Sequence, residues 1–176
     1  SIKKKYKMSV RFCVLIISLV FSACSDEKHA NTPKPKQLTE EANGYYCGMI
    51  VKNHTGPKAQ IYLKGADEPL WFVSVRDAIA FTLLPEEPKN IAAIYVTDMS
   101  IANWQHPELE RESWIDAKQA FYVINSNKNG GMGAAEAIPF LNKEEAFEFS
   151  KVNEGKVIAL NDIPTDYILG SSTELY

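Results

Sequence analysis

The chain is poor in the side chains that usually hold metals or build disulfide frameworks. Its 176 residues include only three cysteines, three histidines and four methionines. No two cysteines have the CxxC spacing and no two histidines the HxxxH spacing, which excludes the usual zinc-binding patterns. Any metal site must therefore be assembled from a few ligands that lie apart in the sequence.

The chain also has no apolar run of the about 20 residues that an ordinary membrane span requires. Residues 12–21 are apolar but few; they follow a basic stretch and end in "VFSAC", where two small residues precede Cys24. This pattern predicts a lipoprotein signal peptide over residues 1–23, cut before Cys24, which then carries lipid. The polar residues 24–43 are predicted to form a flexible, lipidated tether. The alternative is a plain signal peptide with a chance cysteine.

Positive charge is scarce once the signal peptide is removed. Residues 1–23 carry five basic and no acidic side chains, so the net charge falls from −3 to −8 over the remaining 153 residues. An acidic surface argues against nucleic acid as a partner and against an electrostatic grip on anionic lipid. Membrane attachment would then come from the lipid on Cys24.

Only one cysteine is left for the folded part of the chain. Cys13 leaves with the signal peptide and Cys24 is predicted to be lipidated, so Cys47 has no partner. A lone cysteine in an exported protein indicates a free thiol with a function, or pairing between molecules. A buried, inert cysteine is the competing interpretation.

After the tether, the chain shows a run of strand, strand, helix and strand. The strands are alternating or continuously apolar, and the helix has apolar residues at helical spacing before Pro85. These elements are predicted at residues 59–65, 70–74, 75–84 and 91–99.

A similar run follows in the second half of the chain. It is predicted as a strand within residues 113–126, a strand or short turn at 135–141, a helix at 142–155 and a strand at 156–160. Pro139 indicates an edge position in the sheet. Asn142 is the predicted N-cap of the helix, and Gly155 its stop. The residues predicted to face inward are Ala146, Phe147 and Phe149.

These two weak copies, near residues 58–99 and 119–160, predict an α+β protein with two tandem ββαβ-like units. Each unit would have a small antiparallel sheet covered by a helix. The first unit is placed at residues 44–104 and carries "CGM", and the second at residues 105–176 and carries "GMG".

The sulfur atoms of the folded part are few and suggestively placed. Met49 lies in "CGM" beside Cys47, and Met132 lies in "GGMG"; both methionines follow a glycine. Met132 belongs to a polar, glycine-rich stretch, which is unlike the apolar surroundings of a core methionine, whereas Met99 could be either. A thiolate combined with thioethers is the soft ligand set that selects Cu(I) over zinc.

The histidines are weaker candidates, and they leave two other functions open. His29 lies in the tether, and His54 and His106 lie in loop-like segments. Of the last two, His54 is the better auxiliary ligand because it is near Cys47. A cysteine-dependent periplasmic hydrolase would need His54 or His106 as a base beside Cys47. A non-catalytic interaction module with incidental sulfurs is the third possibility.

Four segments carry a family resemblance, in order and spacing. They are "YYCGMIV…GPKAQ", "IYVTDMSIANW", "IDAKQAFYVINSNKNGGMGAAEAIPF" and "A…GKVIALNDI", and together they span roughly residues 45–165. The chain resembles the NosL family, accessory lipoproteins of nitrous oxide reductase that act as copper chaperones. The resemblance implies tandem ββαβ units, a lipid anchor on the periplasmic side, and one bound Cu(I). It also implies delivery toward nitrous oxide reductase with an ABC-type transporter complex, and no catalysis.

The resemblance also implies the metal ligands. Cys47 and Met49 match the family's CGM segment, and Met132 matches its second, methionine-containing segment. Relatives often carry a further cysteine just before CGM, where this chain has Tyr45 and Tyr46. A histidine has been discussed for the family site, but no motif position here matches it, so no histidine joins the predicted set.

Overall fold

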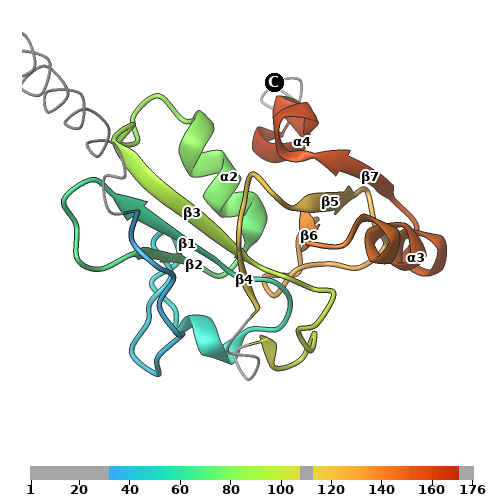
Figure 1. The fold of residues 1–176 in the computed structure, drawn as a ribbon, viewed down its shortest axis with the longest axis horizontal. Coiled ribbons are helices and arrows are strands. Elements are labelled where there is room, and N and C mark those ends of the chain that lie inside the picture. The colour runs from blue at the N-terminus through green and yellow to red at the C-terminus, as the bar shows by residue number, and fades with distance from the viewer. Residues whose placement is uncertain (1–31, 108–112, 171–176) are drawn as a thin grey trace, which may run out of the picture. The chain divides into compact units, whose positions relative to one another are not determined.

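The computed structural model describes residues 32–107 and 113–170 of the chain (Figure 1). The predicted signal peptide, Cys24 and His29 lie outside these residues. From Pro33 onward the chain forms one compact unit. In the part that the structure describes, no helix has both the length and the apolar character needed to cross a membrane.

The first ββαβ unit builds most of a four-stranded antiparallel sheet. Its strand order is β2-β1-β3-β4, and Figure 1 shows α2 packed across this sheet. The unit consists of β1 (Ala59–Leu63), β2 (Leu70–Phe72), α2 (Val75–Leu83) and β3 (Ile91–Thr97), and β4 (Trp114–Asp116) is added from the connection that follows.

The second unit repeats this order in a three-stranded antiparallel sheet, β6-β5-β7. In both units the first strand is central, and the second and third strands lie on either side of it. This confirms the predicted tandem fold, and the position of Pro139 in edge strand β6 is confirmed as well. The elements are β5 (Phe121–Ile124), β6 (Ile138–Phe140), α3 (Lys143–Asn153) and β7 (Lys156–Ala159), followed by η4 (Leu160–Asp162) and α4 (Thr165–Leu169).

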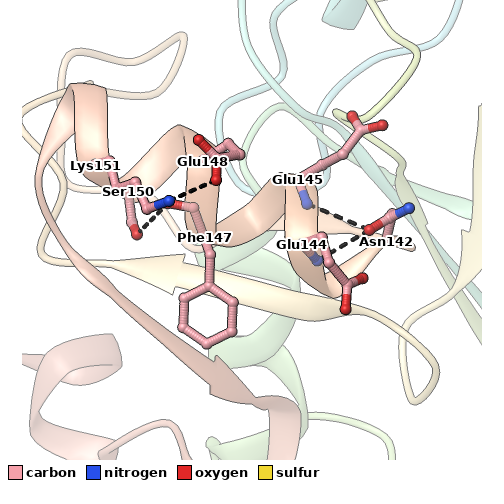
Figure 2. Close-up of polar contacts among 7 residues, drawn as sticks. All are labelled: Asn142, Glu144, Glu145, Phe147, Glu148, Ser150 and Lys151. Carbon is pink, nitrogen blue, oxygen red and sulfur yellow. Dashed lines mark hydrogen bonds and ion pairs between the residues drawn. The ribbon is translucent and has the colours of Figure 1, made fainter.

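Helix α3 begins as predicted, but one of the three residues predicted to face inward is exposed. The Asn142 side chain accepts hydrogen bonds from the backbone N–H groups of Glu144 and Glu145, which Figure 2 shows. Ala146 is buried and Phe149 packs against the core, but Phe147 is 46% exposed, so its predicted inward orientation is wrong. One residue is about 100° of helix rotation, and therefore Phe147 cannot share the face of Ala146.

One strand connects the two halves of the core. Tyr122 and Ile124 of β5 join the larger cluster, which contains side chains of β1, β2, α2 and β3, such as Phe72 of β2 and Phe81 of α2. Val123, between them, faces the opposite way and joins the smaller cluster under α3. The two ββαβ units therefore share a core through the alternating side chains of β5.

The predicted strand between the two units needs correction. The strand predicted within residues 113–126 is two strands, β4 and β5, which belong to different sheets because the turn between them redirects the chain. Two residues of the predicted tether, Pro33 and Lys36, contact the first sheet. Tyr95 donates a hydrogen bond to the Pro33 carbonyl (2.6 Å), and Gln60 exchanges two hydrogen bonds with the Lys36 backbone (2.9 and 3.0 Å), so this part lies on the first sheet.

Candidate metal site

Cys47 and Met49 lie on a short loop, residues 44–49, which we call the CGM loop. It is closed by a bridge between Asn43 and Ile50 and by two hydrogen bonds of 2.8 Å, from Gly44 N to the Met49 carbonyl and from Gly48 N to the Gly44 carbonyl. Gly48 has φ +66°, a conformation that glycine adopts at little cost. The loop sequence therefore folds back on itself between residues 44 and 49.

The Cys47 thiol has a defined place in this loop. It is half-buried and not in a disulfide. A Cβ atom at position 44 would lie 2.6 Å from the Cys47 Sγ and 3.0 Å from Val73, so only glycine leaves room for the sulfur there. Met49 is 37% exposed. The arrangement differs from the apolar burial expected of an inert cysteine.

Met132 lies on a second loop, residues 130–134, which we call the GMG loop. An Asn129–Ala135 bridge closes it, and 2.9 Å hydrogen bonds run from Gly130 N to the Ala134 carbonyl and from Gly133 N to the Gly130 carbonyl. Met132 is 44% exposed, as its polar surroundings predicted. Met99, by contrast, is partly buried and packs against the smaller core cluster.

The GMG loop packs on the segment that continues from the CGM loop through η2 (Val51–Asn53). A Cβ atom at Gly131 would lie 2.4 Å from the Thr55 carbonyl oxygen and 2.9 Å from the His54 Cβ atom, so the two backbones are in close contact. The GMG loop therefore contacts residues 54–56, which follow the CGM loop and η2 in the sequence. Convergence of the Cys47, Met49 and Met132 sulfurs on one ion stays a prediction.

The histidines occupy different positions. His54 Nδ1 lies 3.3 Å from the Gly131 carbonyl oxygen; when Nδ1 donates to it, the Nε2 lone pair remains for other use. His106 is exposed and lies between β3 and β4, away from His54 in the sequence. Its backbone N–H donates to the Asn103 side chain. Among the described residues, no cluster of three or more histidine, cysteine or acidic side chains can hold a metal.

Two buried charged residues support the loops, and sequence reasoning missed both. Lys58 Nζ donates to the Thr55 and Gly56 carbonyls, at 2.6 and 2.7 Å. Glu136 is fully buried, and burial raises the pKa of its carboxyl group to about 7, although backbone hydrogen bonds and Lys58 act in the opposite direction. The only sequence signal was a single acidic residue in the otherwise apolar run "AEAIPF".

Tyr45 and Tyr46 attach the CGM loop to the chain beyond α2. Their hydroxyl groups donate to the two carboxylate oxygens of Glu87, at 3.0 and 2.8 Å, and their rings pack against Phe72. Burial and the neighbouring Glu87 raise the pKa of the Tyr46 phenol. Both tyrosines remain 44% exposed, so these contacts are at the surface.

The fold and the site define a class of protein: a tandem ββαβ domain that presents a thiol and two thioethers on glycine-containing loops. The NosL family model matches residues 35–168, and the chain therefore belongs to the NosL family. It is 42% identical over 162 residues to the Copper-binding lipoprotein NosL of Achromobacter cycloclastes, covering 91% of this chain and 83% of that protein.

Two further relatives agree. The Copper-binding lipoprotein NosL of Stutzerimonas stutzeri is 26% identical over 150 residues, which is 85% of this chain and 76% of that one. The crystal structure of the copper chaperone NosL from Shewanella denitrificans superposes with a TM-score of 0.69 at 29% identity, covering 75% of this chain and 96% of that chain. The resemblance seen in the sequence and the fold expected from it are both confirmed.

Proposed function

We propose that this protein is a lipid-anchored periplasmic metallochaperone that binds one Cu(I) through Cys47, Met49 and Met132. The supporting observation is the pair of bridge-closed, glycine-containing loops with exposed thioethers, the second packed against the continuation of the first. The names of the relatives, copper-binding lipoprotein and copper chaperone, support copper as the cargo.

The ligand chemistry fits transient binding of Cu(I). A thiolate and two thioethers are soft donors, and Cu(I) prefers them to the carboxylates and imidazoles that suit harder ions. The Cys47 thiol must lose its proton to bind, whereas thioethers do not titrate, so loading weakens in acid. Cβ atoms built at Gly48 and Gly133 would meet nothing within 4 Å, so an incoming ligand can approach both loops. Delivery by ligand exchange requires this access.

The proposed cellular role follows from the family and the N-terminus. Lipid on Cys24 would hold the domain at the periplasmic side of a membrane, and copper would be delivered for maturation of nitrous oxide reductase, directly or through an ABC-type transporter complex. No chemical transformation of a substrate is part of this role. The test is copper transfer from loaded protein to apo nitrous oxide reductase, with and without the transporter; absence of transfer in both cases would contradict delivery.

The proposed ligand set is tested by anaerobic Cu(I) titration against a chromophoric competitor. We expect one equivalent to bind, with affinity reduced about 100-fold or more in Cys47→Ser and about tenfold in Met49→Leu and Met132→Leu. Met99→Leu is the matched control, because Met99 is a thioether that packs against the smaller core cluster and lies outside both loops. Unchanged affinity in Cys47→Ser would overturn the proposed site.

A further inference from the structure

Glu136 connects the end of the GMG loop to the start of α2, sixty residues away in the sequence. Its Oε1 accepts three hydrogen bonds: from Arg76 N at 2.8 Å, Ala137 N at 2.9 Å and Ser74 Oγ at 3.2 Å. Ser74 is the N-cap residue of α2, and Arg76 N is one of the first-turn N–H groups that lack a partner within the helix. A carboxylate is suited to this position because the helix N-terminus carries partial positive charge.

The backbone of Glu136 is fixed as well. Its carbonyl oxygen accepts a 2.8 Å hydrogen bond from the Tyr167 hydroxyl of α4, and that hydroxyl also accepts from Asn125 N at 3.2 Å, before the GMG loop begins. Tyr167 therefore holds the chain on both sides of the loop. Glu136 is the residue through which these contacts reach the first ββαβ unit.

The other carboxylate oxygen lies directly beneath the GMG loop. A Cβ atom at Gly130 would be 2.7 Å from Glu136 Oε2 and 3.4 Å from Glu136 Cβ, so glycine allows the loop to rest on the carboxylate. Within the described residues Oε2 has no hydrogen-bond partner. On its other side, Gly131 contacts Thr55, whose carbonyl is bound by Lys58. The loop thus lies between Glu136 on one side and Thr55 on the other, and Met132 is 44% exposed.

We propose that Glu136 is a positioning residue that places the Met132 thioether for metal binding through the backbone of the GMG loop, without contacting the metal. This inference rests on the proposed function for its copper readout. An apolar residue would be easier to bury than a carboxyl group with an unpaired oxygen. The hydrogen bonds to α2 and the contact with Gly130 are what Glu136 adds over an apolar side chain.

The inference is tested with the mature chain, using Cu(I) titration and ¹³C-methyl spectra of methionine. We expect Glu136→Leu to shift the Met132 methyl resonance of the metal-free protein, leave Met49 unshifted, and weaken Cu(I) binding about tenfold, as Met132→Leu does. Glu136→Gln retains an oxygen for the three donors, so it should keep the wild-type Met132 methyl resonance and the wild-type Cu(I) affinity. In the Met132→Leu background, Glu136→Leu should weaken binding no further, because it acts through Met132.

Three outcomes would overturn the inference. The first is an unshifted Met132 methyl resonance in folded Glu136→Leu. The second is full additivity of the two losses of Cu(I) affinity in the double variant. The third is a shifted Met132 methyl resonance in Glu136→Gln. The methyl shift is measured without copper, so it remains decisive if Met132→Leu alone leaves copper affinity unchanged and the proposed ligand set fails.

Should Glu136→Leu not fold, Gly130→Ala tests the same contact from the other side. The new Cβ atom would meet Oε2 at 2.7 Å, and since Oε1 is held by three hydrogen bonds, the loop has to move. We expect the same Met132 shift and a similar loss of affinity. Ala134→Ser, an exposed change in the same loop, is the control that should alter neither. An unshifted Met132 in Gly130→Ala would equally contradict the inference.

Discussion

The two sulfur-bearing loops are built alike. Each is closed by an isolated antiparallel bridge, Asn43–Ile50 in one and Asn129–Ala135 in the other. Each contains a glycine with positive φ, +66° at Gly48 and +77° at Gly133, next to an exposed methionine. A local sequence of a few residues is sufficient to specify this geometry, because glycine adopts it at little cost.

The loops differ in how they are attached to the rest of the molecule. The CGM loop precedes β1, and its backbone is joined to β2 by a Gly44–Trp71 bridge and a 2.7 Å hydrogen bond from Tyr45 N to the Trp71 carbonyl. Its side-chain hydrogen bonds, from Tyr45 and Tyr46 to Glu87, are at the surface. The GMG loop lies within the β5–β6 hairpin and rests on Glu136, which is fully buried. Buried polar contacts are costly to break, whereas exposed ones contribute little. The side-chain support of the GMG loop is therefore buried, whereas that of the CGM loop is exposed.

The buried attachment of the GMG loop predicts the largest effect, a pH-dependent stability. Burial raises the pKa of Glu136 from an ordinary 4.5 to about 7, so the folded protein binds this proton more tightly than the unfolded chain does. The stability that the neutral carboxyl contributes is present below about pH 4.5 and is lost as the pH rises to about 7. Lys58, whose charge favours the carboxylate, and Tyr167 are the neighbouring titratable groups.

Chemical denaturation of Glu136→Gln and wild type at pH 5 and pH 8 measures this effect. The glutamine imitates the neutral carboxyl group, so the variant should match the wild type at pH 5 and exceed its unfolding free energy by about 1–3 kcal/mol at pH 8. Equal pH dependence in the two proteins would show that Glu136 is not the buried, titrating support of the loop.

A smaller effect is expected inside the CGM loop, where Gly44 makes room for the Cys47 sulfur. In Gly44→Ala the new Cβ atom would meet Sγ at 2.6 Å and Val73 at 3.0 Å, so the thiol has to move. We expect a loss of unfolding free energy of about 1–2 kcal/mol and a weaker Cu(I) site. In a Cys47→Ala background the stability cost should shrink, because the sulfur is gone. An equal cost in both backgrounds would mean that the thiol position does not depend on Gly44.

The smallest effect is expected at the surface attachment of the CGM loop. The double variant Tyr45→Phe, Tyr46→Phe keeps both rings but removes both hydrogen bonds to Glu87, and should cost less than about 1 kcal/mol. Tyr122→Phe is the buried control: it removes a 2.6 Å hydrogen bond to the Ala117 carbonyl and should cost about 1–3 kcal/mol. If the double variant lost as much unfolding free energy as Tyr122→Phe, the surface contacts of the CGM loop would be as stabilising as buried ones.

Much of the fold could be predicted from local patterns. The order of the two ββαβ units followed from apolar periodicity, and the Asn142 cap from its position before two glutamates. Phe147 was misplaced because inward and outward positions on a short helix are separated by a single residue. The β4–β5 turn was missed because a run of apolar residues does not reveal which sheet each part will join.

The site could be predicted only in part. The exposure of Met132 followed from its polar, glycine-rich neighbours. Glu136 and Lys58 could not be found, because their roles depend on contacts with residues of other elements, such as Arg76 for Glu136. Gly44 and Gly131 were also missed as structural requirements, since both are needed for close approach of other atoms rather than for an unusual backbone angle.

Strand β5 has a consequence for how the chain reaches its native state. Because Tyr122 and Ile124 complete one cluster while Val123 completes the other, neither ββαβ unit contains a finished interior. An N-terminal fragment would leave Phe72 and Phe81 without part of their covering, and a C-terminal fragment would leave Tyr122 exposed. We therefore expect the two halves to fold as one cooperative unit, with the β5 strand completing both clusters.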